Sequence, residues 1–263
     1  MNEQEMLTLK IAVCYKWVLD EADIVVDQEN NALDVKRAKY KISEIDRNAL
    51  TLGVDLKTND GILLGLTVGP NVKNSVKDVL SRGADKAFFI ESDELESSAA
   101  AKVLAAAIKK IGDIDLVICG EGSSDQYSQQ VGPRIAALLD WNLVTYASDV
   151  KAEGNKLTAI RKLEDEVETI AVNVPAVLTV VSEINQPKVP GMKQILAARK
   201  KPSETVKIEE LNMEKNALKT PVKVMDIGPA VMERRQIQLN KGDVSIPQAA
   251  EKLVGLLRKD KVI

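Results

Sequence analysis

Short β-rich apolar runs alternate with segments of helical periodicity along the first 150 residues, and this alternation limits the possible folds most strongly. The apolar runs lie at 9–14, 62–68, 86–90, 115–119 and 143–147. Between them, apolar residues fall on one face of a helix at 43–56, 72–83, 97–111 and 131–139. The run at 62–68 is apolar almost throughout, which is typical of a strand covered on both faces. The pattern predicts an α/β fold with an open, mostly parallel, doubly wound sheet.

Two local patterns add detail before residue 60. Residues 24–26 and 32–35 are β-rich and flank Asn30 and Asn31, which predicts a hairpin with its turn at the two asparagines. Ser43 stands before a helical segment, and Asp46 follows three residues later. This spacing predicts a capped helix start, because a side-chain oxygen at the cap accepts a bond from a backbone N–H group.

The pattern changes after residue 149. Short strands are expected at 157–161 and 167–172, and a further strand at 176–181. We expect these to be antiparallel strands added to the edge of the sheet. With them, an α/β domain would occupy residues 1–184.

Residues 185–263 lack the regular alternation that precedes them. The stretch 185–240 holds most of the prolines, many charges and no long periodic segment. So long an irregular stretch is improbable inside one compact domain unless it packs on another protein. Leu253, Val254 and Leu257 then share one face of a helix. We therefore expect 185–263 to be an extended C-terminal arm that wraps and recognises a partner and ends in a helix.

The chain has no histidine, which excludes several kinds of chemistry at once. There can be no Ser-His-Asp triad, no Cys-His dyad, and no zinc or haem held by histidine. Cys14 and Cys119 are too few for a metal cluster, and we expect small packing residues rather than a disulfide or reactive thiols. Any redox or acid–base chemistry must therefore come largely from a bound cofactor.

The charges are nearly balanced, with 36 Lys+Arg against 39 Asp+Glu and a net charge of -3. A nucleic-acid-binding protein needs a basic excess on one face, so we do not expect that function. The opening MNEQEMLTLK lacks the apolar centre of a signal peptide, and no apolar run reaches the length that spans a bilayer. We expect a cytoplasmic protein without membrane insertion.

Two loops could hold a ligand, because open parallel sheets bind ligands at the carboxyl ends of their strands. One loop, 14–20, follows the first strand, and the other, 120–133, follows the fourth parallel strand. The second is rich in small and hydrogen-bonding residues and leads into a helix, whose first N–H groups and dipole favour a phosphate. It matches neither Gly-x-Gly-x-x-Gly nor a Walker motif, so a surface loop before a capped helix is the alternative.

Residues 159–179 contain an acidic motif followed by a spaced proline. It reads Ala159-x-Arg161-x-x-Glu164-Asp165-Glu166-x-Glu168-x-Ile170, then Pro175-x-Val177-Leu178-Thr179. Residues 42–49, the loop 120–133 with its Gln-Val-Gly-Pro ending, and residues 189–202 supply further motifs. Together they resemble the β subunit of electron-transfer flavoproteins over almost the whole chain. One departure is Gln126-Tyr127-Ser128, where the family usually has Gly-Asp-Thr.

The resemblance implies a subunit of a heterodimer whose α subunit carries the electron-transferring FAD. The family's β subunit binds a nucleotide of its own, a structural AMP in one branch and a second FAD, reduced by NADH, in the electron-bifurcating branch of anaerobes. Segments 42–49 and 130–134 are more similar to the second branch, so FAD is favoured and AMP is the alternative. By position, the implied cofactor contacts are Cys14, Ser43, Asp46, Val68, Gly120, Asp125, Ser128, Gln129, Gln130, Val131 and Gly132.

The same resemblance implies a route for electrons, in which no residue of this chain is itself catalytic. Electrons from NADH would divide between a low-potential acceptor, ferredoxin or flavodoxin, and the α-subunit FAD, which serves an acyl-CoA or hydroxyacid dehydrogenase or reductase. The AMP-binding alternative is a structural subunit that stabilises the α subunit and docks the dehydrogenase without carrying electrons. Arg134 is a candidate positive charge near the flavin or the nicotinamide nucleotide, or else an exposed helix arginine.

Met192 lies in the segment that resembles the family's recognition loop. In that family an apolar side chain of this loop enters a pocket on the partner dehydrogenase. Pro190 and Gly191 predict a turn that would project the Met192 side chain. Packing of Met192 on its own subunit is the alternative.

Overall fold

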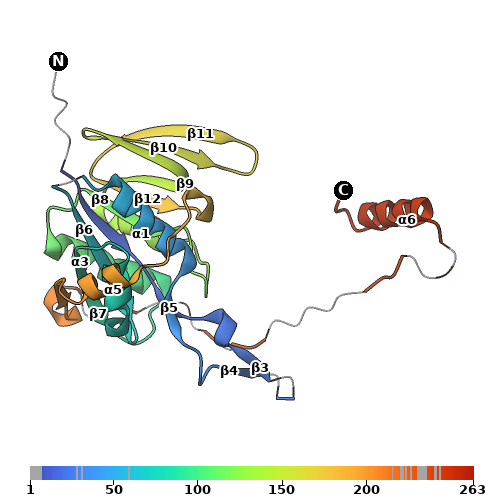
Figure 1. Ribbon diagram of the computed structural model, residues 1–263, viewed down its shortest axis with the longest axis horizontal. Helices are drawn as coiled ribbons and strands as arrows, with labels where there is room; N and C mark the ends of the chain where they lie inside the picture. The colour runs from blue at the N-terminus through green and yellow to red at the C-terminus, as the bar shows by residue number, and fades with distance from the viewer. Residues whose placement is uncertain are drawn as a thin grey trace.

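Within the described residues, nine strands form a single sheet at the centre of the molecule (Figure 1). The computed structural model describes residues 8–27, 29–30, 32–58, 60–214, 216–219, 222, 224–225, 227–229, 236–239, 242 and 244–263. In spatial order the strands are β11 (Val167–Asn173), β10 (Lys156–Lys162), β9 (Asn142–Glu153), β12 (Ala176–Val180), β8 (Leu116–Gly120), β1 (Lys10–Cys14), β6 (Ile62–Gly69), β7 (Lys86–Glu91) and β13 (Ser203–Thr205). From β9 to β13 in this order, each strand is parallel to its neighbours. At the other end of the sheet, β9 pairs antiparallel with β10, and β10 with β11. The predicted α/β fold with a mostly parallel sheet is confirmed.

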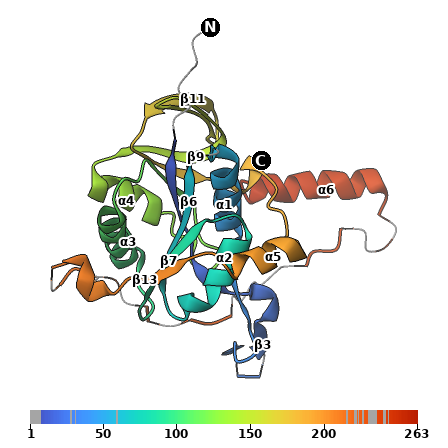
Figure 2. The ribbon, with the colours of Figure 1, turned by 60° about the vertical axis from the view of Figure 1, so that its left-hand side comes forward.

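Helices cover both faces of the sheet (Figure 2). One face carries α1 (Glu44–Leu56), α2 (Val76–Ser81) and α5 (Met192–Ala198), and the other carries α3 (Ser97–Ile111) and α4 (Val131–Leu139). The last helix, α6 (Ile246–Lys259), lies apart from the sheet in Figure 1. Single 3-10 turns occur at η1 (Glu21–Asp23), η2 (Val72–Ser75), η3 (Ser182–Ile184) and η4 (Ile208–Leu211). The helices thus make the doubly wound arrangement that the sequence predicts.

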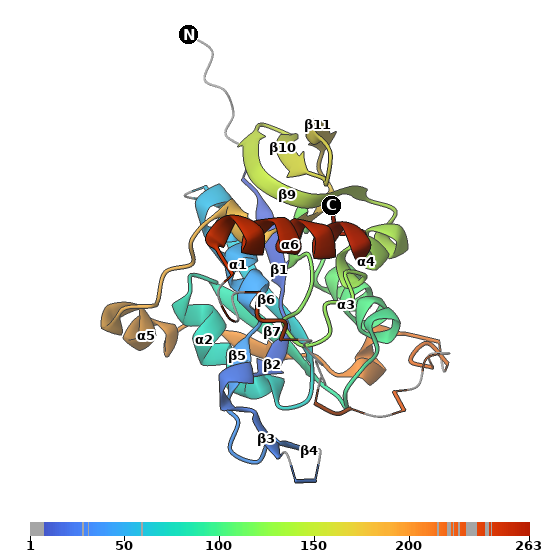
Figure 3. The same ribbon diagram turned by 90° about the vertical axis from the view of Figure 1, so that its right-hand side faces the viewer.

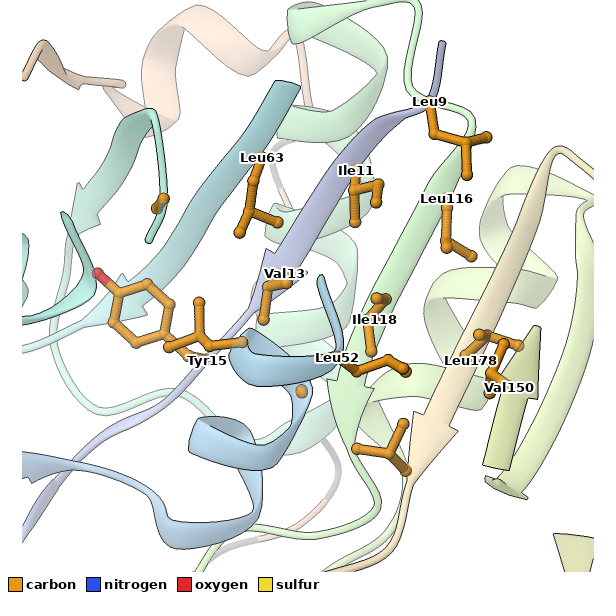
Figure 4. Packing of buried hydrophobic residues seen from close by; sticks show 14 of the residues in the cluster. Leu9, Ile11, Val13, Tyr15, Leu52, Leu63, Leu116, Ile118, Val150 and Leu178 are labelled. Carbon is orange, nitrogen blue, oxygen red and sulfur yellow. The ribbon is translucent and has the colours of Figure 1, made fainter. Parts of the chain in front are cut away.

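The core consists of two mainly aliphatic layers, one on each face of the sheet. Alternate residues of β1 enter different layers: Ile11 and Val13 pack beneath α1, whereas Ala12 and Cys14 face α3 and α4. Figure 4 shows the first layer, where Ile11 and Val13 lie beside residues from the neighbouring strands, such as Leu63. Because both faces are buried, the central strands read as continuous apolar runs.

Two small antiparallel pairs lie outside the main sheet. β2 (Trp17–Leu19) pairs with β5 (Tyr40–Ile42), and β3 (Val25–Asp27) pairs with β4 (Ala32–Asp34). The second pair is the predicted hairpin, which projects from the body in Figure 3. Asn30 lies in its turn, and Asn31 is outside the described residues.

The prediction for residues 176–181 is wrong in both direction and place. β12 is parallel to β8 and β9 and lies between them, inside the sheet rather than at its edge. All five of its residues are buried, as a strand covered on both faces requires. The other two expected strands, β10 and β11, do add antiparallel to the edge.

The predicted cap at Ser43 is also wrong. The helix begins at Glu44 as expected, but the Ser43 side chain makes no cap bond. Its Oγ accepts instead from the backbone N–H of Ser124, 3.1 Å away, and Asp46 turns toward the ends of two strands. Neither side chain caps the helix, because both accept from backbone N–H groups outside it, those of Ser124, Lys16 and Gly120.

The chain after residue 184 is not separate from the body at first. β13 extends the sheet beside β7, and Ala198, Val206 and Leu211 are buried in the two core layers. In contrast, no residue of α6 is buried. Met213 and Leu218 also pack against the second layer. The chain from residue 185 therefore stays on the body at least as far as Leu218, and the domain division at 184 stays a prediction.

Candidate functional site

The order of the strands places a crevice between β1 and β8. From β1 the chain proceeds through β6 and β7 on one side, and then crosses to β8, β12 and β9 on the other. The direction of winding reverses between β1 and β8, and ligands bind at such points in open α/β sheets. At their carboxyl ends, Cys14 and Cys119 are register partners and both line a cavity of about 70 Å³.

Asp46 holds the ends of the two strands together from the first turn of α1. Its Oδ2 accepts from the backbone N–H of Lys16 at 2.8 Å, and its Oδ1 accepts from that of Gly120 at 2.9 Å. Gly120 permits this approach, since a Cβ there would lie 2.6 Å from Oδ1. Burial raises the pKa of the Asp46 carboxyl to about 7, and Asp125 adds to the rise, whereas the two N–H bonds and Lys16 oppose it.

The loop between β8 and α4 folds over the cavity through contacts of its own. The Tyr127 hydroxyl donates to the Glu121 carboxylate, and the Tyr127 ring packs on Gly122. Tyr127 and Gln129 have φ values of 45° and 56°, in the left-handed region that non-glycine residues seldom occupy. Such backbone persists only where its surroundings hold it, and it clusters at ligand sites.

A row of backbone N–H groups without acceptors lies where the loop after β8 enters α4, and Ser128, Gln129, Gln130 and Val131 of this row line the cavity. Within the described part of the chain, the N–H groups from Ser128 to Gly132 form no hydrogen bond. Val131 and Gly132 are the first two residues of α4, whose N–H groups have no partner within the helix. An anion at this helix start would receive these bonds and the positive end of the helix dipole.

Lys16 supplies positive charge at the crevice. It is the one cation among the described residues that line the cavity, where Asp46 and Glu121 carry the carboxyl groups. Its Nζ lies 2.5 Å from Asp125 Oδ2 and 3.3 Å from Glu94 Oε1. Burial alone would raise the pKa of Asp125, but the bonds from Lys16 and Ser123 outweigh it and lower that pKa.

The thiols of Cys14 and Cys119 form part of the cavity wall. Their contact and the burial of both side chains raise the pKa of Cys119 well above its usual value. A neutral thiol is a poor nucleophile, so this geometry agrees with the expected packing role.

The structure brings together most of the predicted contacts. Those that line the cavity are Cys14, Asp46, Gly120, Ser128, Gln129, Gln130 and Val131. Asp125 adjoins it through its bond to the lining residue Lys16, and Ser43 accepts from Ser124, which follows the lining residue Ser123. Val68, Gly132 and Arg134 do not line it.

Two of the predicted contacts that lie off the cavity have other partners. A Cβ on Gly132 would collide with Thr179 of β12, so the missing side chain lets α4 pack on the sheet. The Arg134 guanidinium donates to Gln130 Oε1 at 2.8 and 3.0 Å. The N–H of Gly132 and the charge of Arg134 stay predicted contacts.

Sequence reasoning missed Lys16 as a site residue, although it lies in the first of the two candidate loops. It stands two residues after Cys14, directly beyond the end of β1. The signal was its position, since a cation just past a central strand reaches the crevice. Glu121 and Tyr127 were missed because their pairing depends on the fold of the loop.

The fold and this crevice define a doubly wound α/β protein with a small cavity at the carboxyl ends of β1 and β8. A family model described as electron transfer flavoprotein domain matches residues 32–211, which is more than half of the chain. The chain therefore belongs to the electron transfer flavoprotein family. Members of this family are flavoproteins that transfer electrons and typically form heterodimers with an α subunit. No helix among the described residues is long and apolar enough to cross a membrane.

Proposed function

We propose that this chain is the β subunit of an electron-bifurcating flavoprotein heterodimer, and that its crevice binds FAD reduced by NADH. The observation that supports a nucleotide site most strongly is the row of N–H groups without acceptors from Ser128 to Gly132, most of whose residues line the same cavity as Lys16. The resemblance of residues 42–49 and 130–134 to the bifurcating branch supports FAD. The α subunit would carry a further FAD that serves a partner dehydrogenase or reductase.

The donors of the crevice fit a phosphate group well. The N–H groups of the four lining residues Ser128, Gln129, Gln130 and Val131, together with one ammonium, would replace much of the hydration of a phosphate. The cavity of about 70 Å³ is far smaller than the roughly 300–1,000 Å³ of typical ligand pockets. A whole nucleotide therefore requires the loop over the cavity to move outward.

In this proposal the flavin supplies the hydride and electron chemistry, and the protein supplies placement. The N–H groups at the start of α4 bind the phosphates. Asp46 fixes the ends of β1 and β8, from which Lys16 and the loop project. Cys14, Cys119 and Leu104 form an apolar wall that excludes water from one side.

The second candidate is an AMP-binding subunit that carries no electrons, and the small size of the cavity favours it. AMP offers one phosphate to the same N–H groups and needs less room than FAD. In this case the chain would stabilise the α subunit and dock the dehydrogenase. Both candidates place the phosphate at the same residues.

Docking to the dehydrogenase is proposed to use Met192. The residue is 71% exposed at the first position of α5, after Gly191. Leu196 of the same helix is half exposed, so an apolar surface is available beside it. An adaptable thioether rimmed by Lys193 and Arg199 suits a transient interface. Ferredoxin or flavodoxin would accept the low-potential electron.

Mass spectrometry of the ligands released from the purified heterodimer tests the proposal. Two FAD molecules in each heterodimer are expected for the bifurcating subunit. One FAD together with one AMP would establish the second candidate. One FAD with no nucleotide from this chain would contradict both candidates.

A further inference from the structure

Lys16 has a fixed backbone and a side chain that reaches across the mouth of the crevice. Its N–H donates to the buried Asp46 carboxyl, which anchors the residue at the end of β1. Its Nζ pairs with Asp125 in the loop after β8 and with Glu94 in the loop after β7. One cation at the cavity therefore joins three segments: the end of β1, the loop after β7 and the loop after β8.

These ion pairs are open to water. The side chain of Lys16 is 28% exposed, and those of Asp125 and Glu94 are 35% and 57% exposed. Partly exposed ion pairs contribute little to stability, because water and salt screen them. Lys16 can therefore change partners at small cost.

The other charged groups that line the cavity already have hydrogen-bond partners. Both Asp46 oxygens accept backbone N–H bonds, and Glu121 accepts from the Tyr127 hydroxyl. The ion pair of Lys16 with Asp125 also holds the loop down over a cavity too small for a nucleotide. Exchange of this one pair would remove one of the contacts that hold the loop, beside the bonds of Ser124 to Ser43 and of Tyr127 to Glu121, and would free a cation at the cavity.

We propose that Lys16 is a phosphate-binding residue that exchanges the Asp125 carboxylate for the ligand's phosphate, and so couples binding to opening of the loop. This inference rests on the proposed nucleotide site. Asp125 competes with the phosphate for the same ammonium group. Lys16 contributes attraction for the phosphate, whereas Asp125 sets how much of that attraction is available.

The test measures the affinity of the full-length chain, co-purified with its second subunit and depleted of nucleotide, for AMP, ADP and adenosine. Lys16→Gln is expected to weaken AMP and ADP about tenfold or more while adenosine stays within about twofold, since one charge-assisted bond is lost. Lys16→Arg should restore most of the loss. Asp125→Asn should strengthen AMP binding about two- to fivefold, because its competition for Lys16 is removed.

Lys41→Gln is the matched control, since Lys41 forms ion pairs with Asp20, Glu21 and Glu44 away from the cavity. It should change none of the affinities. An equal loss for AMP and adenosine in Lys16→Gln, no loss at all, or weakened AMP binding in Asp125→Asn would each overturn the exchange. If the unaltered protein bound neither FAD nor any of the three probes, the proposed nucleotide site itself would be wrong, and not only the exchange.

Discussion

Two amphipathic helices of similar length, α3 and α6, differ in how far they are buried. α3 has 15 residues and buries seven of them against the sheet, whereas α6 has 14 residues and buries none. Both carry an apolar face, and Leu253 and Val254 lie on that of α6. An apolar face predicts that a helix packs against another surface, but it does not say whether that surface belongs to the same chain or to a partner. The body supplies the cover for α3, and we expect the proposed α subunit to supply it for α6.

Truncation of one apolar residue in each helix should separate the two cases most clearly. Ile108→Ala in α3 is expected to lower the free energy of unfolding by about 2–5 kcal/mol, because it leaves a cavity in the core. Leu253→Ala in α6 should change the unfolding of the isolated chain by less than about 0.5 kcal/mol. Urea unfolding of both variants measures the difference, and similar losses would mean that α6 packs on the body. The second variant should weaken association with the partner subunit.

The buried carboxyl group of Asp46 makes the stability of the body depend on pH. Its pKa is raised to about 7, so the folded state keeps a proton that the unfolded chain loses near the ordinary value of 3.8. The stability that it contributes is therefore complete below pH 4 and is lost as the pH rises through about 7. Between pH 5 and 8 this loss should be on the order of 2 kcal/mol.

Unfolding of the wild type and of Asp46→Ala at pH 5 and pH 8 checks this sign. The stability difference between the two proteins should move against the wild type at the higher pH. Asp125→Ala is the control, because the pKa of Asp125 is lowered and no proton exchange occurs in that interval. A difference that stays constant from pH 5 to pH 8 would show that Asp46 is ionised throughout.

Two glycines in helices extend the comparison from side chains to backbone. A Cβ on Gly132 of α4 would collide with Thr179, whereas a Cβ on Gly255 of α6 would meet nothing within 4 Å. Gly132→Ala is expected to destabilise the chain by about 1–3 kcal/mol through overpacking and to weaken nucleotide binding as α4 shifts. Gly255→Ala should leave calorimetric stability unchanged or raise it by up to about 1 kcal/mol through helix propensity. Equal effects in thermal unfolding would refute the difference in packing.

Met192→Ala tests the exposed side of the molecule. We expect docking to the dehydrogenase to weaken by about 1–3 kcal/mol, the range of an interface hot spot. Flavin content should not change, because Met192 does not line the crevice. Val167→Ala, an equally simple truncation of an exposed residue on β11, is the control in the same electron-transfer titration. Loss of flavin with normal docking would assign this loop to the cofactor site instead.

The sequence predicts the alternating core of the fold because each central strand is a continuous apolar run between clear helical segments. It fails at β12, whose run of Ala176 to Val180 has the composition of a buried strand but gives no sign of its pairing partners. Neighbours in a sheet are a property of topology, and a strand that follows a hairpin can return to the centre. The antiparallel strands around it led to the wrong expectation.

At the site, residue types were easier to predict than their contacts. The loop after β8 could be selected from its small residues and its place before α4. That Asp46 would bind Gly120 rather than cap its own helix depends on how α1 packs against β8. Likewise, Lys16 becomes important only because its partners come from two other loops. Long-range contacts of this kind leave no pattern within one segment.

Hydrogen–deuterium exchange of the heterodimer, with and without nucleotide, tests the central claim most directly. The N–H groups from Ser128 to Gly132 have no acceptor within the described chain, so they should exchange rapidly when nucleotide is absent. Added nucleotide should slow their exchange by about tenfold or more while α6 keeps its rate, because phosphate bonds form only at the crevice. Unchanged exchange at these residues, with new protection elsewhere in the chain, would contradict the proposed site.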